Sequence, residues 1–403
     1  MKIAINGAGI AGPTLAYWLH SFGHEPVLYE QAPALRSGGY VIDFWGIGYD
    51  IAEKMGLIGQ IRELGYQVGE VRFVNSAGRS NGGLSADVFS RMTNDRYTSL
   101  KRSDLAAAIY GAIDGKVETV FGDSIAAIEE HRDGVHLSFD HAAPRDFDLV
   151  VGADGLHSRV RDRVFGPQEQ FETFLGYKVA AFEASGYPVR DERVYVSHTL
   201  PGRQTARFTM RDDRTLFLFV YRDENRDLPT SDDERKAVLE RIFGKDGWEL
   251  PQILAAMRDT DGIYFDRVSQ IRMDNWTKGR TALIGDAAAC ASLLAGEGCG
   301  LAMTEAYVLA GKLASTGGNH TIAYAAYHDE LRDFLQAKQD SARKFASAFA
   351  PQTASGIWFR NLVTRLMRFQ PIADWFVGRD LRDDIDLPDY EKMVLGKASD
   401  VVL

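Results

Sequence analysis

The chain begins with a regular exchange of short apolar runs and an amphipathic stretch. An apolar run at 2–6 leads into a glycine-rich turn, a segment with helical spacing, and a second apolar run, EPVLYE, at 25–30. Runs of this length predict a strand, a helix and a second strand parallel to the first. This order predicts an α/β fold for the N-terminal part of the chain.

The turn after the first strand carries glycines at three positions, Gly7, Gly9 and Gly12, with Ala11 just before the last. In this G-x-G-x-x-G spacing the first glycine allows a tight turn. The second lets the backbone approach a pyrophosphate, and the third lets the helix pack closely on the strand. Glu30 ends the second strand, where an acid can accept hydrogen bonds from an adenosine ribose. The segment therefore predicts a dinucleotide site at a helix N-terminus.

The pattern between residues 31 and 140 predicts short elements. In order they are a loop at 31–44, a helix at 46–57, strands near 68–76 and 97–101, a helix at 101–113, and strands at 116–121, 124–131 and 134–140. Ser103 or Asp104 is the expected N-cap of the second helix. The continuous apolar run at 147–155 is typical of a buried parallel strand, so we expect the chain to return to its first sheet there.

Residues 172–271 have a different pattern. Period-two or continuous apolar runs predict strands at 176–184, 193–200, 205–211 and 214–222, helices near 231–243 and 250–258, and a closing strand at 262–273. The polar turn RDDR is expected to join two of these strands as a hairpin. We therefore expect a second, mainly antiparallel sheet inserted into the first domain.

The remainder returns to the pattern of the first domain. A buried strand is predicted at 281–289, helices at 298–315 and about 319–348, and an amphipathic segment at 357–376. We interpret this last segment as a docking helix over the core, with a partner or membrane surface as the alternative. The predicted fold class is α/β (α+β). It comprises a Rossmann-like dinucleotide-binding domain from 1–171 and 272–340, an inserted substrate-binding sheet at 172–271, and a C-terminal helical segment at 341–403.

Composition excludes some classes of protein. The 403 residues are 45% hydrophobic with a net charge of −10, which argues against nucleic acid or an anionic membrane as partner. Two cysteines are too few for a disulfide scaffold, which indicates a reducing compartment and a cytoplasmic protein. No uncharged apolar run is long enough to span a membrane, and we expect no metal.

A second glycine-and-acid pair lies far from the first. Gly285 and Asp286 end a predicted strand, and a helix begins just after Gly296, Glu297 and Gly298. The acid can accept from a polyol hydroxyl, and the helix N-terminus offers free N–H groups to an anionic ligand. The alternative is a plain strand-to-loop turn. Two grips far apart in sequence indicate one long ligand, and FAD is long enough to reach both.

Together these segments resemble the single-component FAD-dependent aromatic hydroxylases, the family typified by para-hydroxybenzoate hydroxylase. The glycine turn with Glu30 matches the family's FAD pyrophosphate and ribose motif. Asp154 with Gly155, Ser158 and Arg161 matches its DG motif, which is linked to FAD and to pyridine nucleotide. The GD motif, here Gly285 and Asp286, holds the ribityl chain in the family. LKRSDL fits its Arg-x-x-Leu segment, which implies that Arg102 lies near the ribityl chain and pyrophosphate.

The segments SGGYVID and LLAGEGCGLAMTEAYVLAGKL are most similar to the branch that contains the tetracycline-inactivating monooxygenases. The resemblance implies that Asp43 lies near the flavin and that residues of the second segment border the isoalloxazine, namely Gly296, Gly298, Cys299 and Gly300.

The chain departs from the family pattern at a few positions. Gln31 stands where an arginine often follows the ribose acid, and Arg36 is a candidate to replace it. Ala289 and Leu293 replace a usual histidine and proline after the GD motif, which changes the expected wall beside the flavin.

The resemblance implies an FAD-dependent, NAD(P)H-consuming monooxygenase. Such an enzyme hydroxylates an aromatic or polycyclic, polyketide- or antibiotic-like molecule with O2 through a flavin C4a-hydroperoxide. The alternative is a reductase or dehydrogenase on the same scaffold. No second G-x-G-x-x-G follows a later strand, so NADPH or NADH is expected to dock transiently. We expect a monomer or homodimer.

The substrate pocket is expected between the second sheet and the flavin, because oxygen transfer needs a site that excludes water. Arg207 is a candidate to orient an acidic or phenolate substrate, or else an exposed charge on an edge strand. Phe219 and Tyr221 share one face of a strand and are candidates to line the pocket, or else plain core. Which face lines the pocket stays open, because one step of register exchanges the two. No residue is assigned as an acid or base.

Overall fold

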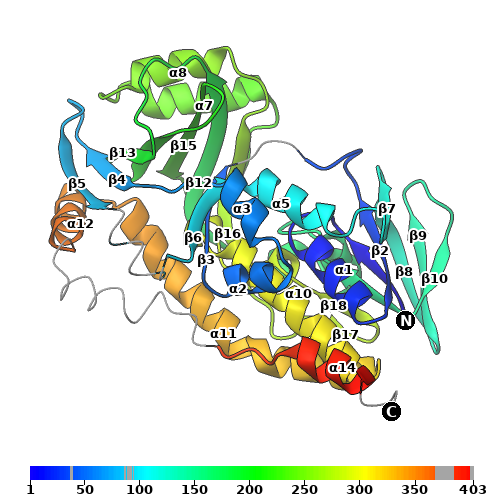
Figure 1. The fold of residues 1–403 in the computed structure, drawn as a ribbon. Helices are drawn as coiled ribbons and strands as arrows, with labels where there is room; N and C mark the ends of the chain where they lie inside the picture. The colour runs from blue at the N-terminus through cyan, green and yellow to red at the C-terminus, as the bar shows by residue number, and fades with distance from the viewer. Residues whose placement is uncertain (37–39, 86–87, 89–92, 94, 368–384, 400–403) are drawn as a thin grey trace.

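The computed structural model describes the chain except for residues 37–39, 86–87, 89–92, 94, 368–384 and 400–403 (Figure 1). A six-stranded sheet forms the base of the fold. Its strand order is β17 (Thr277–Lys278), β18 (Thr281–Leu283), β11 (Leu149–Gly152), β1 (Lys2–Asn6), β2 (Glu25–Glu30) and β7 (Glu118–Phe121). All neighbours run parallel except β17 and β18. The expected return of the chain to its first sheet is confirmed, because β11 pairs with β1.

One large core joins this sheet to the helices around it. The buried residues come from the strands and from α1 (Ala11–Ser21), α2 (Gly46–Lys54), α3 (Ile58–Leu64), α5 (Arg102–Gly111) and α10 (Gly298–Ser315). A three-stranded sheet lies beside β2 and β7, formed by β8 (Ile125–His131), β9 (Gly134–Phe139) and β10 (Arg145–Phe147) (Figure 1). Tyr29 of β2 stacks on Phe139 of β9 with ring centroids 4.2 Å apart, so the two sheets share a core.

A seven-stranded sheet forms the second layer of the fold. Its order is β16 (Tyr264–Ile271), β12 (Glu172–Ser185), β15 (Arg214–Arg222), β14 (Arg203–Thr209), β13 (Val194–Leu200), β4 (Glu70–Val74) and β5 (Ser80–Ser85). The predicted hairpin joins β14 and β15. Two strands, β4 and β5, come from the range 1–171, and β4 pairs parallel with β13. The division of the chain into domains at 172 and 271 stays a prediction.

Helices cover one side of this sheet. α7 (Asp232–Phe243) and α8 (Leu250–Arg258) lie over it at the top of Figure 1. They bury an apolar cluster that includes Leu239, Phe243 and Ile253 against aromatic residues of the strands. The opposite side of the sheet faces the six-stranded half of the molecule, where a separate cluster joins the two.

The remaining helices are α6 (Arg159–Val164), α9 (Asp286–Ala289), α11 (His320–Phe349), α12 (Ala354–Leu366) and α14 (Tyr390–Ser399), with 3₁₀ turns at Gln168–Gln170 and Leu293–Ala295. The long α11 runs from beside α10 to the seven-stranded sheet (Figure 1). α12 lies next to β5 and leaves Trp358 65% and Phe359 60% exposed. A docking helix is expected to bury its apolar face. This helix leaves part of that face exposed. The predicted continuation from 368 to 376 lies outside the described residues.

Three local predictions were wrong. Of the strand predicted at 281–289, only Thr281–Leu283 is a strand, and Asp286–Ala289 forms the short helix α9. Residues 41–44, expected within a loop, belong to β3 (Val41–Trp45), which pairs with β6 (Tyr97–Lys101) as a separate two-stranded sheet. Its apolar positions Ile42 and Phe44 alternate as a half-buried strand requires, so tertiary burial outweighed the nearby glycines. Helix α5 begins at Arg102 after Lys101, and no side chain caps it. Ser103 and Asp104 therefore lie inside the first turn.

Candidate functional site

The glycine turn between β1 and α1 has the geometry of a phosphate cradle. Gly7 has a φ of 111°, and a Cβ there would lie 2.5 Å from the carbonyl oxygen of Ala153. A Cβ on Gly12 would lie 1.9 Å from the carbonyl oxygen of Gly7, so only glycine lets the helix pack this closely. A Cβ on Gly9 would meet only the Arg102 guanidinium, at 3.6 Å. The turn is thus closed on two sides and open at Gly9.

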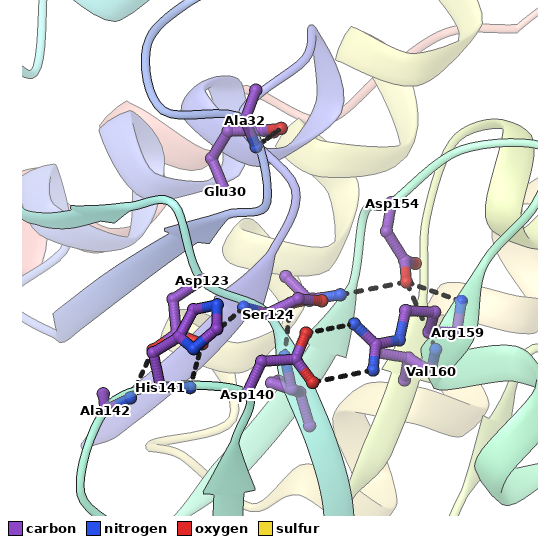
Figure 2. Close-up of polar contacts among 12 residues, drawn as sticks. Glu30, Ala32, Asp123, Ser124, Asp140, His141, Ala142, Asp154, Arg159 and Val160 are labelled. Carbon is purple, nitrogen blue, oxygen red and sulfur yellow. Dashed lines mark hydrogen bonds and ion pairs between the residues drawn. The ribbon is translucent and has the colours of Figure 1, made fainter.

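Glu30 is held at the end of β2 by backbone donors. Its carboxylate accepts from the N–H of Ala8 at 2.8 Å. It also accepts from the N–H of Ala32 at 2.9 Å (Figure 2). The acid is therefore fixed directly beside the glycine turn. Arg36 lies 3.9 Å from Glu30 and is largely exposed, and Gln31 is also exposed. Neither side chain is held in place as Glu30 is.

Asp123, which the sequence did not single out, supports this region. Its N–H donates to the carbonyl of Glu30 at 3.0 Å. Its buried carboxylate accepts from the N–H groups of Ser124, His141 and Ala142 (Figure 2). Asp123 thus joins the end of the Glu30 strand to the β9–β10 turn. A lone Asp in a loop gives no sequence signal for such a role.

Asp154 of the DG motif makes its bonds within the protein. Its carboxylate accepts from Asn6 Nδ2 at 3.0 Å and from the Ser158 hydroxyl. It also accepts from the N–H groups of Arg159 and Val160 (Figure 2). It therefore joins the end of β1 to the N-terminus of α6. By these bonds Asp154 stabilises the backbone next to the glycine turn.

Arg161 of the same motif is fully buried. Its guanidinium donates to the carbonyls of Leu156 at 2.7 Å and of Ala287 at 3.2 Å. Since Ala287 directly follows Asp286, Arg161 fixes the DG motif to the GD motif.

The GD motif lies against the glycine turn. A Cβ on Gly285 would lie 3.2 Å from the Cβ of Ala11, and Gly285 has a φ of 62°. A Cβ on Gly298 would lie 4.0 Å from Asp286 Oδ1. Burial raises the pKa of the Asp286 carboxyl, and the Arg102 guanidinium opposes that rise. The two regions predicted to grip one ligand are therefore neighbours in space.

The two cysteines are free thiols near this group. Burial raises the pKa of Cys299 to about 11, although the Arg102 guanidinium lowers it. Burial also raises the pKa of Cys290 well above its usual value. Both thiols therefore stay protonated at neutral pH and act as small packed side chains. Gly296 and Gly300 lie on either side of the α10 N-terminus, and Gly300 packs against Gly48 of α2.

Glu305 is a second acid that was not predicted from the sequence. It lies on α10 with 1% of its surface exposed, and it accepts from the N–H of Gly285 at 2.8 Å. The Tyr327 hydroxyl lies 3.2 Å from the same oxygen and 3.1 Å from the carbonyl of Leu283. Burial raises the pKa of Glu305 well above its ordinary value. The sequence did carry a signal for this acid: it lies within the mostly apolar helix segment GCGLAMTEAYVL, where a carboxyl group is unusual.

The three substrate-pocket candidates lie on the far side of the seven-stranded sheet. Phe219 and Tyr221 are buried in the cluster under α7 and α8. Arg207 is 2% exposed on the interior strand β14, so its interpretation as an exposed edge charge is wrong. It pairs with Glu249 at 2.8 Å and with Asp191 at 2.6 Å. These residues pack the helices onto the sheet and do not meet the GD motif.

Comparison with known proteins identifies the family. The chain matches the FAD binding domain family over residues 1–342. It is 36% identical to a flavin-dependent monooxygenase from an unknown prokaryotic organism and 35% identical to one from Legionella longbeachae; each match covers 84% of this chain and 87% of that protein. The chain belongs to the FAD-dependent monooxygenases.

Solved structures agree with the family assignment. The tetracycline destructase Tet(51) is 30% identical, with a TM-score of 0.81, 96% of this chain covered and 99% of that chain. The predicted α/β fold class and the family resemblance are therefore confirmed. FAD is the cofactor of this monooxygenase family, and the open glycine turn fits it. Among the described residues, no helix of this monooxygenase is both long and apolar enough to cross a membrane, and no side chains cluster as metal ligands do.

Proposed function

We propose that this monooxygenase hydroxylates an aromatic or polycyclic small molecule with O2 and uses NADPH or NADH as a transient co-substrate. The observation that carries the proposal is the close approach of Gly285 to Ala11. A Cβ placed on Gly285 would lie 3.2 Å from the Cβ of Ala11. One extended FAD can reach both acids, since the two strand ends that bear Glu30 and Asp286 flank the same glycine turn.

The position of each residue indicates which part of the cofactor it would contact. Gly7, Gly9, Ala11 and Gly12, with the N-terminus of α1, would hold the pyrophosphate. Glu30 would accept from the ribose, while Arg102 and Asp286 would hold the ribityl chain. The N-terminus of α10, from Gly296 through Cys299 to Gly300, would border the ring system. Asp154 would act indirectly, by stabilising the backbone next to the turn, and Gln31 and Arg36 would remain at the exposed rim.

FAD supplies the redox chemistry when bound, since it accepts hydride from the nicotinamide and activates O2. The protein's own task is to orient the substrate and to exclude water. Apolar and aromatic side chains from both halves meet between the sheets, including Val41, Trp45, Phe208 and Leu218. This layer lies on the sheet side opposite Phe219 and Tyr221, so we assign the pocket to the Leu218 face.

The test is turnover by the purified protein with a panel of phenolic and polycyclic compounds. We expect the protein to bind FAD, to oxidise NADPH or NADH faster with one class of compound, and to give a product labelled from isotopic O2. Reduction of the compound without labelled oxygen would support the reductase alternative. Absence of flavin from the folded protein would contradict the whole proposal.

Two broader expectations belong to the same proposal. The small number of cysteines supports action in the cytoplasm, where thiols stay reduced. Light scattering would distinguish the expected monomer from the expected homodimer.

Tetracycline-like molecules belong in the panel of test compounds because tetracycline destructases are similar in structure over almost the whole chain.

A further inference from the structure

The loop at 290–297 connects α9 to α10 and ends in the segment proposed to border the flavin ring. Its backbone is strained at Ser292, where φ is 130° and ψ is 143°, a conformation that residues other than glycine rarely adopt. Gly296 ends the 3₁₀ turn of the loop with a φ of 72°. A strained residue keeps its conformation only where the surrounding structure holds it, so this loop needs support from other elements.

Two buried amide side chains hold the start of the loop. Gln339 of α11 donates through Nε2 to the carbonyl of Cys290 at 3.2 Å. Gln270 of β16 donates through Nε2 to the carbonyl of Ala291 at 2.6 Å. Gln339 is 4% exposed and Gln270 is fully buried, so water does not compete for these bonds. The two residues before Ser292 are therefore fixed to α11 and β16.

An ion pair holds the end of the loop. Lys338, which precedes Gln339 on α11, places its ammonium 2.9 Å from Oε2 of Glu297, and its side chain is 9% exposed. The ammonium also lies 5.8 Å from the ring centroid of Trp45 and 5.7 Å from that of Phe334, within the range of cation–π attraction. Two successive residues of α11 thus contact opposite ends of one strained loop.

A neighbouring acid makes Glu297 depend on this ammonium. Asp43 and Glu297 line the same small cavity of about 10 Å³, beside Gly300. Two carboxylates at one cavity repel each other, and the charge of Lys338 offsets that repulsion. Without the ammonium, Glu297 is expected to turn toward solvent and to shift the end of the loop.

We propose that Lys338 and Gln339 are positioning residues, which keep the 290–297 loop in the strained form that binds the ring end of FAD. The adenosine end of the cradle is built without them, from the glycine turn and Glu30. Loss of either contact lets Ser292 relax, and the apparent affinity for FAD then falls with the fraction of molecules that keep the strained form. This inference rests on the proposed function, because it takes the α10 N-terminus as the border of the flavin ring.

The test compares two ligands of the apoprotein, FAD and ADP. ADP carries the adenosine and pyrophosphate of FAD without the flavin ring, so it reports on the glycine turn and Glu30. Lys338→Met keeps the length of the side chain and removes its charge. It should weaken FAD binding about tenfold to hundredfold, the range set by restoring one strained residue, and change ADP binding less than about twofold. Flavin fluorescence measures the first affinity and calorimetry the second.

Gln339→Leu tests the other end of the loop, because it keeps the volume of the side chain and removes the donor to Cys290. It should reproduce the selective loss of FAD affinity. In both variants, iodide should quench the fluorescence of bound flavin more strongly than in the wild type, because the ring end is less enclosed. Retained ADP binding shows that a variant is folded.

Glu297→Ala completes a double-mutant cycle with Lys338→Met. If the ammonium acts through Glu297, adding Lys338→Met to Glu297→Ala should weaken FAD binding no further. A full additional loss would show that the ammonium contacts the cofactor directly and would overturn the positioning role.

Lys312→Met is the matched control. Lys312 also joins α10 to α11, through Glu330 at 3.0 Å, and its ammonium lies 5.8 Å from the ring centroid of Tyr390. It lies near the C-terminal end of α10, away from the loop, so both affinities should stay at the wild-type values.

Normal FAD binding in both Lys338→Met and Gln339→Leu, or equal losses for FAD and ADP, would overturn this inference and leave the proposed function standing. A folded wild-type apoprotein that binds no FAD would overturn the proposed function and this inference with it. Because the titrations need no turnover, a failed turnover assay does not affect their outcome.

Discussion

At the scale of single residues, the acids around the glycine turn differ in what surrounds them. Glu30 and Asp154 accept hydrogen bonds from donors of the protein itself and hold backbone segments together. Asp286 lies with Arg102 at the edge of the cradle. Glu305 has a buried oxygen, Oε1, without a described partner. Burial without full pairing favours the neutral form of a carboxyl group.

Gly9 provides a clear test of the cradle. Gly9→Val should lower FAD affinity at least about a hundredfold, because a side chain would fill the space through which a pyrophosphate approaches. The fold should survive, since a Cβ there meets only the end of the Arg102 side chain. FAD binding to the apoprotein, followed by flavin fluorescence, measures the effect.

Gly59→Val is the matched control for Gly9, because a Cβ at this surface helix position meets nothing within 4 Å. It should bind FAD as the wild type does. Normal flavin occupancy in Gly9→Val would contradict the assignment of the cradle.

Glu305 gives a pH prediction. The fold raises its pKa well above the ordinary value of 4.5, so above 4.5 the unfolded chain releases a proton that the native state keeps. The native state then binds more protons, and the free energy of unfolding falls as the pH rises through this window. Glu305→Gln removes the titration but keeps an acceptor for the Gly285 N–H. Its unfolding free energy should depend less on pH between about pH 5 and 8.

Urea titrations at several pH values measure this slope. Glu305→Ala is the contrasting variant: it leaves the Gly285 N–H without its buried acceptor and should lower FAD affinity, which Glu305→Gln should largely preserve. An unchanged pH slope in Glu305→Gln would show that Glu305 is ionised in the native state.

At the scale of elements, the seven-stranded sheet separates two apolar layers with different tasks. One layer fixes α7 and α8, and the other joins the sheet to β3 and β6. Strand β15 serves both, since Phe217 and Phe219 face the helices while Leu216 and Leu218 face the flavin half. A buried charge group around Arg207 lies in the helix-covered layer.

Arg207→Ala tests that placement. The change removes the buried cation from Glu249 and Asp191, although Asp191 keeps its pair with Arg72 and Glu249 its bond from the Tyr187 hydroxyl. The free energy of unfolding should therefore fall by about 1–3 kcal/mol. Chemical denaturation measures the loss. Below the unfolding transition, FAD content and KM should match the wild type. A selective rise in KM for an acidic probe, with the free energy of unfolding unchanged, would instead support the prediction that Arg207 binds the substrate.

At the scale of the whole molecule, segments distant in sequence complete the site. The side-chain amide of Gln270 on β16 donates to the backbone carbonyl of Gln339 on α11 at 2.7 Å. The side-chain amide of Gln339 donates in turn to the backbone carbonyl of Ile271 at 2.6 Å. Arg161 connects the DG motif to α9, and Glu305 connects α10 to Gly285. The cradle is therefore stabilised by contacts between elements, and none of these contacts follows from a local pattern.

The glycine spacing, the acid at the end of β2 and the βαβ order were predictable from the sequence, because each depends on residues close together in the chain. Gly7 and Gly12 have a conformation and packing that only glycine permits, and such constraints are visible in one sequence. Strand positions followed from apolar runs of period two for the same local reason.

Only the tertiary structure decided which face of β15 looks toward the flavin half. Both faces of that strand are apolar, so the period-two pattern is symmetric and carries no direction. The same holds for Arg207 and Asp43: the surroundings of a charged side chain depend on which strands and helices pack against it. Glu305 meets Gly285, and Val41 and Trp45 of β3 meet the seven-stranded sheet, because burying apolar faces brings the halves together. That requirement belongs to the whole chain.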